Sequence, residues 1–140
     1  MENNITIYTD GGSRGNPGPA AAGVVILKNG EEIKKIGKTL GVTTNNVAEY
    51  TAVVEGLRWL VEHKEEVGEY KAIHFYMDSL LLCQQLKGVY KIKQPHLRSL
   101  MYIIRELESK LAVSISYTHI RREFNKRADA MVNLALDNLL

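Results

Sequence analysis

The 140-residue sequence lacks most features of disulfide-bonded, membrane-spanning or disordered proteins. Its one cysteine, Cys83, cannot form a disulfide within the chain, so a reducing, cytoplasmic location is expected. No apolar run approaches the roughly 20 residues that span a bilayer, and the polar start of the chain indicates neither a signal peptide nor a membrane partner. The hydrophobic fraction of 45% and the charged fraction of 24% exclude a disordered chain, a collagen-like repeat and a coiled-coil rod.

Net charge is also small, because 18 Lys and Arg residues face 16 Asp and Glu residues. A formal charge of +2 does not by itself indicate a nucleic-acid-binding protein. The charges are separated along the chain, however. The four charged residues of segment 87–98 are all basic and those of segment 119–127 are basic except Glu123, whereas those of segment 62–69 are acidic except Lys64. This separation predicts a basic face on a nearly neutral protein, although solvated loops and helix faces would give the same pattern.

Hydrophobic periodicity predicts five strands and four helices in one domain spanning residues 1–140. Alternating or continuous apolar residues predict the strands at residues 5–10, 20–28, 31–42, 72–77 and 113–120. Spacings of three and four predict a long helix that begins after Asn45 or Asn46 and ends at Gly68. The same spacings predict helices at residues 79–86, 96–111 and 125–140.

The order of these elements predicts an α/β fold built on one mixed sheet. Asn29-Gly30 is a strong two-residue hairpin signal, so the first three strands should form an antiparallel meander. Each of the two later strands is reached through a helix and should run parallel to the first strand. The helices are expected to cover the faces of the sheet.

Carboxylates stand at the ends of several predicted elements. Asp10 closes the first strand and Asp78 closes the fourth, and the ends of parallel neighbours meet at one edge of a sheet. Glu49 and Asp129 lie near the starts of the two helices that could reach the same edge. We therefore expect four carboxylates to converge there. Taken singly, Glu49 or Asp129 would be better explained as a charge at a helix N-terminus, where a negative charge is favourable.

Four clustered carboxylates cannot all remain ionised without a cation, because like charges at short range repel strongly. Oxygen ligands without thiolates or clustered histidines favour Mg²⁺ or Mn²⁺. Two such ions about 3.5–4 Å apart can activate water and stabilise the leaving oxygen of a phosphodiester.

Four segments that span the chain resemble the motifs of type 1 ribonuclease H, in the order of that family. They are residues 8–18 (YTDGGSRGNPG), 44–49 (TNNVAE), 76–79 (YMDS) and 119–129 (HIRREFNKRAD). The resemblance implies the ribonuclease H fold and endonucleolytic cleavage of the RNA strand of an RNA–DNA hybrid, leaving 5′-phosphate and 3′-hydroxyl ends. It also implies that two Mg²⁺ or Mn²⁺ ions are held, with substrate bound, by Asp10, Glu49, Asp78 and Asp129.

The resemblance also implies roles for residues around these acids. His119 is similar to a mobile histidine that assists proton movement or product release, and Thr44 to part of a phosphate pocket for the DNA strand. The glycine-rich segment suits close approach to RNA 2′-hydroxyls, and paired asparagines suit minor-groove edges. A tight turn and a helix N-cap would use the same residues. The expected substrate contacts are Gly11, Gly12, Ser13, Arg14, Asn16, Thr44, Asn45, Asn46 and Asn125.

Two departures from the family pattern concern substrate binding. Leu80 stands where many relatives have a glutamine or asparagine that contacts a base. Residues 88–95 are short and contain only Lys91 and Lys93, whereas some relatives insert a basic helix with aromatics there. No separate hybrid-binding domain is expected before Asn3. We therefore expect weaker substrate affinity with a steep salt dependence.

Two other functions are compatible with such a fold. One is a non-catalytic nucleic-acid-binding module, which would gain nothing from four mutually repelling acids. The other is a DNA-acting nuclease or strand transferase, which shares some acids but lacks the glycine-rich segment with Asn-Asn-x-x-Glu. No obligatory protein partner is expected, and a monomer is the simplest assembly.

Overall fold

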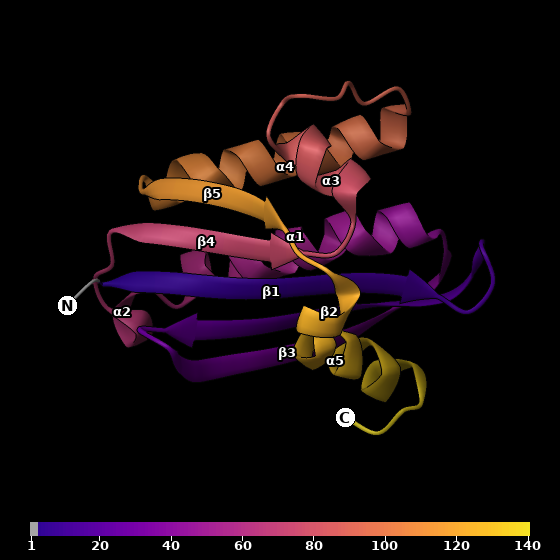
Figure 1. Ribbon diagram of the computed structural model, residues 1–140, viewed down its shortest axis with the longest axis horizontal. Helices are drawn as coiled ribbons and strands as arrows, with labels where there is room; N and C mark the ends of the chain where they lie inside the picture. Colours follow the sequence, from indigo (N-terminus) through magenta and orange to yellow (C-terminus); the bar gives the residue numbers. More distant parts are fainter. Residues whose placement is uncertain (1–2) are drawn as a thin grey trace.

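A computed structural model of the chain describes residues 3–140 and contains one five-stranded mixed sheet (Figure 1). The strand order is β3-β2-β1-β4-β5, with β1 to β3 antiparallel and with β4 and β5 parallel to β1. This confirms the predicted meander and the predicted parallel strands. The strands are β1 (Asn4–Ser13), β2 (Gly18–Lys28), β3 (Glu31–Thr43), β4 (Ala72–Met77) and β5 (Ser114–His119).

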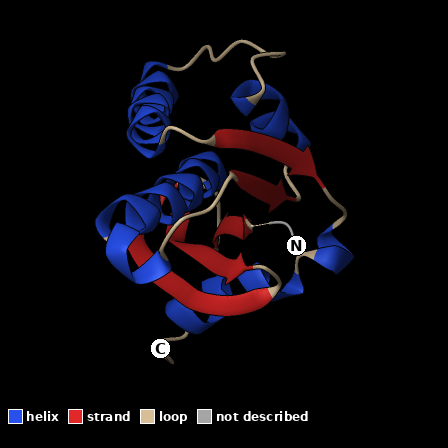
Figure 2. Cartoon of the chain, turned by 90° about the vertical axis from the view of Figure 1, so that its left-hand side faces the viewer, coloured by secondary structure: helices blue, strands red, loops and turns tan. Residues whose placement is uncertain are grey.

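Helices lie on both faces of the sheet (Figures 1 and 2). On one face α1 packs against β1, β2 and α4, and on the other α5 packs against β1, β2 and β3. Within residues 3–140, none of these helices is both long and apolar enough to cross a membrane. The helices are α1 (Asn45–Glu62), α2 (Lys64–Val67), α3 (Leu80–Leu86), α4 (Pro95–Leu111) and α5 (Lys126–Leu136), and a short 3-10 turn, η1, covers Arg122–Phe124.

The main core lies between the sheet and the α1/α4 layer. Ile5 and Ile7 of β1 and Phe75 of β4 are fully buried there against Leu57 and Leu60 of α1. Alternate residues of each strand point to opposite faces, so the intervening residues of β1 and β4 face the α5 side. Trp59 also belongs to this core, where its ring stacks on that of His63.

Strand β1 is longer than the sequence predicts. It continues to Ser13 instead of ending at Asp10, because Gly11, Gly12 and Ser13 pair with an alanine-rich stretch of β2. The glycine-rich segment is therefore partly strand, and the turn that follows occupies only residues 14–17.

Helix α1 begins earlier and ends earlier than predicted. Its N-cap is Thr44, not Asn45 or Asn46, because the Thr44 hydroxyl accepts a hydrogen bond from the Val47 amide at 3.3 Å. The helix stops at Glu62, and a separate short helix, α2, reaches Gly68. Glu49 consequently lies in the second turn of α1, where the predicted stabilisation by the helix N-terminus is weak.

Candidate active site

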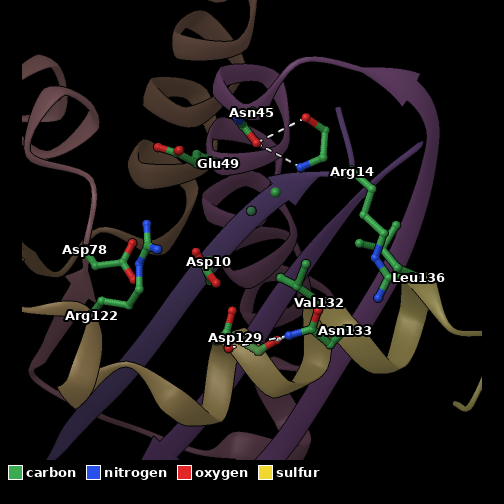
Figure 3. A pocket seen from close by; sticks show the side chains of 13 residues that line it. Asp10, Arg14, Asn45, Glu49, Asp78, Arg122, Asp129, Val132, Asn133 and Leu136 are labelled. Carbon is green, nitrogen blue, oxygen red and sulfur yellow. Dashed lines mark hydrogen bonds between the residues drawn. The ribbon is translucent and has the colours of Figure 1, made fainter. Parts of the chain in front are cut away.

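The four predicted carboxylates line one cavity of about 280 Å³ at the edge of the sheet (Figure 3). Each comes from a different part of the fold. Asp10 belongs to β1, Glu49 to α1 and Asp129 to α5, while Asp78 directly follows β4. The predicted meeting of these four side chains is therefore present in the structure.

Strand register and one glycine bring three of the acids together. The parallel pairing of β1 with β4 ends at Tyr8 and Tyr76, so Asp10 and Asp78 both lie just beyond the last pair. Gly11 then touches α1. A Cβ atom at Gly11 would lie 2.2 Å from the carbonyl carbon of Ala48, so only glycine permits this approach. The contact holds Glu49 of α1 beside the end of β1.

Asn125 fixes the fourth acid. Its side chain is 1% exposed, and its Nδ2 donates a hydrogen bond to the carbonyl oxygen of Thr9 at 2.8 Å. This bond ties the start of α5 to β1 and places Asp129, in the first turn of α5, beside Asp10. The prediction that Asn125 contacts substrate is therefore wrong for this structure, because the side chain points into the protein interior.

Replacing Asn125 by alanine is expected to lower the free energy of unfolding by about 1–3 kcal/mol, because the buried carbonyl of Thr9 loses its side-chain donor. Urea denaturation followed by circular dichroism measures this change. The matched control is Lys126→Ala, at the exposed next residue, which should stay within about 0.5 kcal/mol of the wild type. Equal losses in the two variants would contradict the bond's contribution.

The acids strongly influence one another's protonation. Burial and, after it, the negative charges of Asp78 and Asp129 together raise the pKa of Asp10 from 3.8 to about 8. Burial also raises the pKa of Glu49, while a hydrogen bond from Ser79 and the positive charge of Arg122 oppose that rise. The cavity therefore holds more negative charge than it can accommodate in the absence of a cation.

Among the predicted substrate contacts, Gly11, Gly12, Ser13, Arg14 and Asn45 line the cavity. The Oδ1 atom of Asn45 accepts hydrogen bonds from the Ser13 amide at 2.8 Å and from the Ser13 hydroxyl at 3.1 Å. Arg14 forms an ion pair of 2.7 Å with Asp137 beyond the end of α5. These contacts join the glycine-rich segment, which forms one wall of the cavity, to the first turn of α1 and to the C-terminal segment.

Four other predicted residues do not line the cavity. Asn16 accepts a hydrogen bond from the Asn45 amide at 3.1 Å, Thr44 caps α1, and Asn46 lies in the first turn of α1. His119 is exposed at the end of β5, paired with Met77, which immediately precedes Asp78. The predicted role of His119 thus stays a prediction.

The cavity also contains residues that are not among the predicted metal ligands and hybrid-specific contacts. Arg122, one of several basic residues in its segment, lies next to Asp78 in Figure 3. Val132, Asn133 and Leu136 line the wall formed by α5. They follow Asp129 at helical spacings of three, four and seven, so the helical period could have identified them. Which arginine of the segment faces the acids depends on η1, a turn too short to leave a periodic signal.

The donor set fits hard divalent cations, because all four acidic groups offer oxygen ligands to the same cavity. The raised pKa of Asp10 also indicates a place where positive charge is needed. Among residues 3–140, no three His, Cys, Asp or Glu side chains converge closely enough to hold an ion as they stand. An ion held by three or more of these groups therefore requires their side chains to rotate toward one another.

Comparison with known proteins gives a consistent set of similarities. A family model described as reverse transcriptase-like matches residues 8–135. The ribonuclease HI of Halobacterium salinarum is 41% identical over 96% of this chain and 65% of its own length. A bifunctional protein of Mycobacterium tuberculosis is 36% identical over 95% of this chain and 35% of its own length. The chain therefore spans only part of these curated relatives.

Solved structures are similar over nearly the whole chain. LC11-RNase H1, isolated from compost by a metagenomic approach, has a TM-score of 0.89 at 42% identity, with 97% of each chain covered. The same protein has been solved in complex with an RNA/DNA hybrid. The RNase H1 of Halobacterium salinarum has a TM-score of 0.87 at 38% identity, over 96% of this chain and 98% of that one.

Proposed function

This chain belongs to the type 1 ribonuclease H family, and on that premise we propose that it hydrolyses the RNA strand of RNA–DNA hybrids. The observation that carries the proposal is the cavity in which Asp10, Glu49, Asp78 and Asp129 meet from four parts of the fold. The hybrid-bound structure of the similar LC11-RNase H1 supports the substrate class. The glycine-rich segment and Asn45, on the same wall, suit contacts with RNA 2′-hydroxyls.

The four carboxylates are proposed to hold two Mg²⁺ or Mn²⁺ ions once substrate is bound. When bound, such ions supply an activated water and charge stabilisation for the leaving 3′ oxygen, which yields 5′-phosphate and 3′-hydroxyl ends. Asp10 gives up its proton when positive charge arrives, because the cation offsets the repulsion from Asp78 and Asp129. Arg122 contributes fixed positive charge at the same wall, and His119 is proposed to assist proton movement or product release from the neighbouring loop.

We propose that the hybrid also binds to the short segment of residues 87–94, here named the basic loop. Its backbone is held in place from both sides. Gln85 donates to the carbonyl of Lys91 at 3.4 Å, and Arg98 donates to the carbonyls of Ile92 at 2.8 Å and Lys93 at 3.2 Å. The side chains of Lys91 and Lys93 remain exposed, as does Tyr90 at 47%. A fixed loop with free cations suits phosphate contacts.

Replacing Lys91 and Lys93 together by alanine is expected to weaken hybrid binding and to reduce the salt dependence of log Kd by about 1.5–2, since each phosphate contact contributes close to one. Fluorescence anisotropy in Ca²⁺ across a salt series measures this slope. Lys71→Ala, at an exposed residue just before β4, serves as the matched control and should leave the slope unchanged. An unchanged slope in the double variant would show that the basic loop does not contact the phosphates of the hybrid.

Cleavage of a set of labelled duplexes tests the proposed function. In Mg²⁺ or Mn²⁺ we expect the RNA strand of a hybrid to be cut, while duplex DNA, duplex RNA and a four-way junction remain intact. No cleavage is expected in EDTA. Retained hybrid binding without cleavage would favour the binding module, and cleavage of DNA or of the junction would favour a DNA-acting nuclease.

A further inference from the structure

Thr9 carries a buried hydroxyl next to the four acids. The residue is 1% exposed, and it alternates along β1 with Ile5 and Ile7, so its side chain points toward α1. Among residues 3–140, its Oγ1 atom has no hydrogen-bond partner. A buried hydroxyl without a partner is costly, so most native proteins supply one. We therefore expect the Thr9 hydroxyl to gain a hydrogen-bond partner when the side chains of the site are arranged differently.

The surroundings of Thr9 limit the choice of partner. The side chain borders a small recess beside the acids that has no room for a water molecule. The partner must therefore be a protein group. The other walls of the recess are formed by Asp10, Glu49, Met77, Asp78, Ser79 and Leu82.

Glu49 is the acid best placed to accept from this hydroxyl. It projects from α1, the helix that the Thr9 side chain faces, whereas Asp10 follows Thr9 on the opposite face of β1. The Glu49 carboxylate already accepts a hydrogen bond from Ser79, whose hydroxyl in turn accepts from the Leu82 amide at 3.2 Å. A carboxylate has further lone pairs free for a second donor.

We propose that Thr9 is a positioning residue whose hydroxyl donates to the Glu49 carboxylate when divalent cations draw the four acids together. Ser79 and Thr9 then hold the carboxylate from two sides and fix its orientation toward the ions. This inference rests on the proposed function for the presence of the ions. It adds to the site a residue that does not line the cavity itself. Groups that orient metal ligands in this way typically change metal affinity by 10–100-fold.

The test compares Thr9→Val, which keeps the shape and removes the hydroxyl, with Thr9→Ser, which keeps the hydroxyl. Isothermal calorimetry with Mn²⁺ on the substrate-free proteins is the primary measurement. We expect Thr9→Val to bind Mn²⁺ about tenfold more weakly and to lose a similar factor in kcat, with an unchanged KM for hybrid. Thr9→Ser should stay within about threefold of the wild type in both measurements. The thermal stability of metal-free Thr9→Val should not fall, since the lost hydroxyl has no partner in that state.

Two outcomes would overturn the positioning role. One is Mn²⁺ affinity in Thr9→Val equal to that of the wild type, and the other is a Thr9→Ser variant as weak as Thr9→Val. If Thr9→Val does not fold, Thr9→Ala takes its place in the same comparison. Failure of the proposed function is distinguishable, because a wild type that binds Mn²⁺ but cuts no hybrid would leave the calorimetric difference intact.

Discussion

Asp10→Asn is expected to cleave an RNA–DNA hybrid at least about a thousandfold more slowly than the wild type in saturating Mg²⁺. Asp10 is the acid whose pKa is raised by both Asp78 and Asp129, and all three line the same cavity. Its loss therefore removes an anionic ligand common to the whole cluster. Metal ions contribute several kcal/mol of charge stabilisation in such reactions, and each 1.4 kcal/mol corresponds to about a factor of ten in rate.

Single-turnover cleavage of a labelled hybrid measures this effect, and hybrid binding in Ca²⁺ confirms that the variant is folded and engages substrate. Glu123→Gln is the matched control, because Glu123 is an exposed acid near the site that does not line the cavity. It should cleave within about twofold of the wild type. A rate for Asp10→Asn within tenfold of the wild type would show that Asp10 is not essential, and the four-acid site would have to be abandoned.

The metal-free protein is expected to become less stable as the pH rises from about 4 to about 8. Burial and the nearby charges of Asp78 and Asp129 raise the pKa of Asp10 to about 8, whereas the unfolded chain has the ordinary value of 3.8. Between these values the folded state keeps a proton that the unfolded state has lost. The stabilisation is therefore complete below pH 3.8 and is lost as the pH rises through about 8. The slope contributed by this one group is at most about 1.4 kcal/mol per pH unit.

Urea denaturation in EDTA at several pH values between 5 and 8 measures this slope. The Asp10→Asn variant should show a flatter profile, and the difference between the two profiles isolates the contribution of Asp10. Saturating Mg²⁺ should raise the stability of the wild type most at pH 8, where the carboxylates carry the most charge. Parallel profiles for wild type and variant in EDTA would contradict the raised pKa of Asp10.

The sheet and the meeting of the acids could be predicted because they depend on the type and order of whole strands and helices. Alternation in β1 and β4, together with the helix between them, determines their parallel pairing, and this pairing brings Asp10 and Asp78 to one edge. The motif order of the type 1 ribonuclease H family then identified the remaining acids, Glu49 and Asp129. These features involve whole elements, so errors of a few residues at element ends do not change them.

Individual side-chain directions could not be predicted, because they depend on tertiary packing. Asn125 is a polar residue of the kind that usually contacts solvent or substrate, but here it is buried. The start of α5 packs against β1, and the Asn125 side chain donates to the Thr9 carbonyl. Thr44 rather than Asn45 caps α1, because Asn45 is already held by Ser13 and Asn16. Each outcome depends on residues distant in sequence, and single-sequence patterns do not report such contacts.

The contact between Gly11 and the backbone of α1 has a consequence for how the protein loses activity on heating. Because β1 and α1 meet there without an intervening side chain, Asp10 and Glu49 stand on two elements that cannot separate while the main core is intact. Asp78 and Asp129 are attached to the same β1 strand through β4 and through Asn125. All four acids are thus tied to β1, so catalytic competence and the native state of the core should disappear in one cooperative transition. Residual activity after a heat pulse would then report the fraction of molecules still folded.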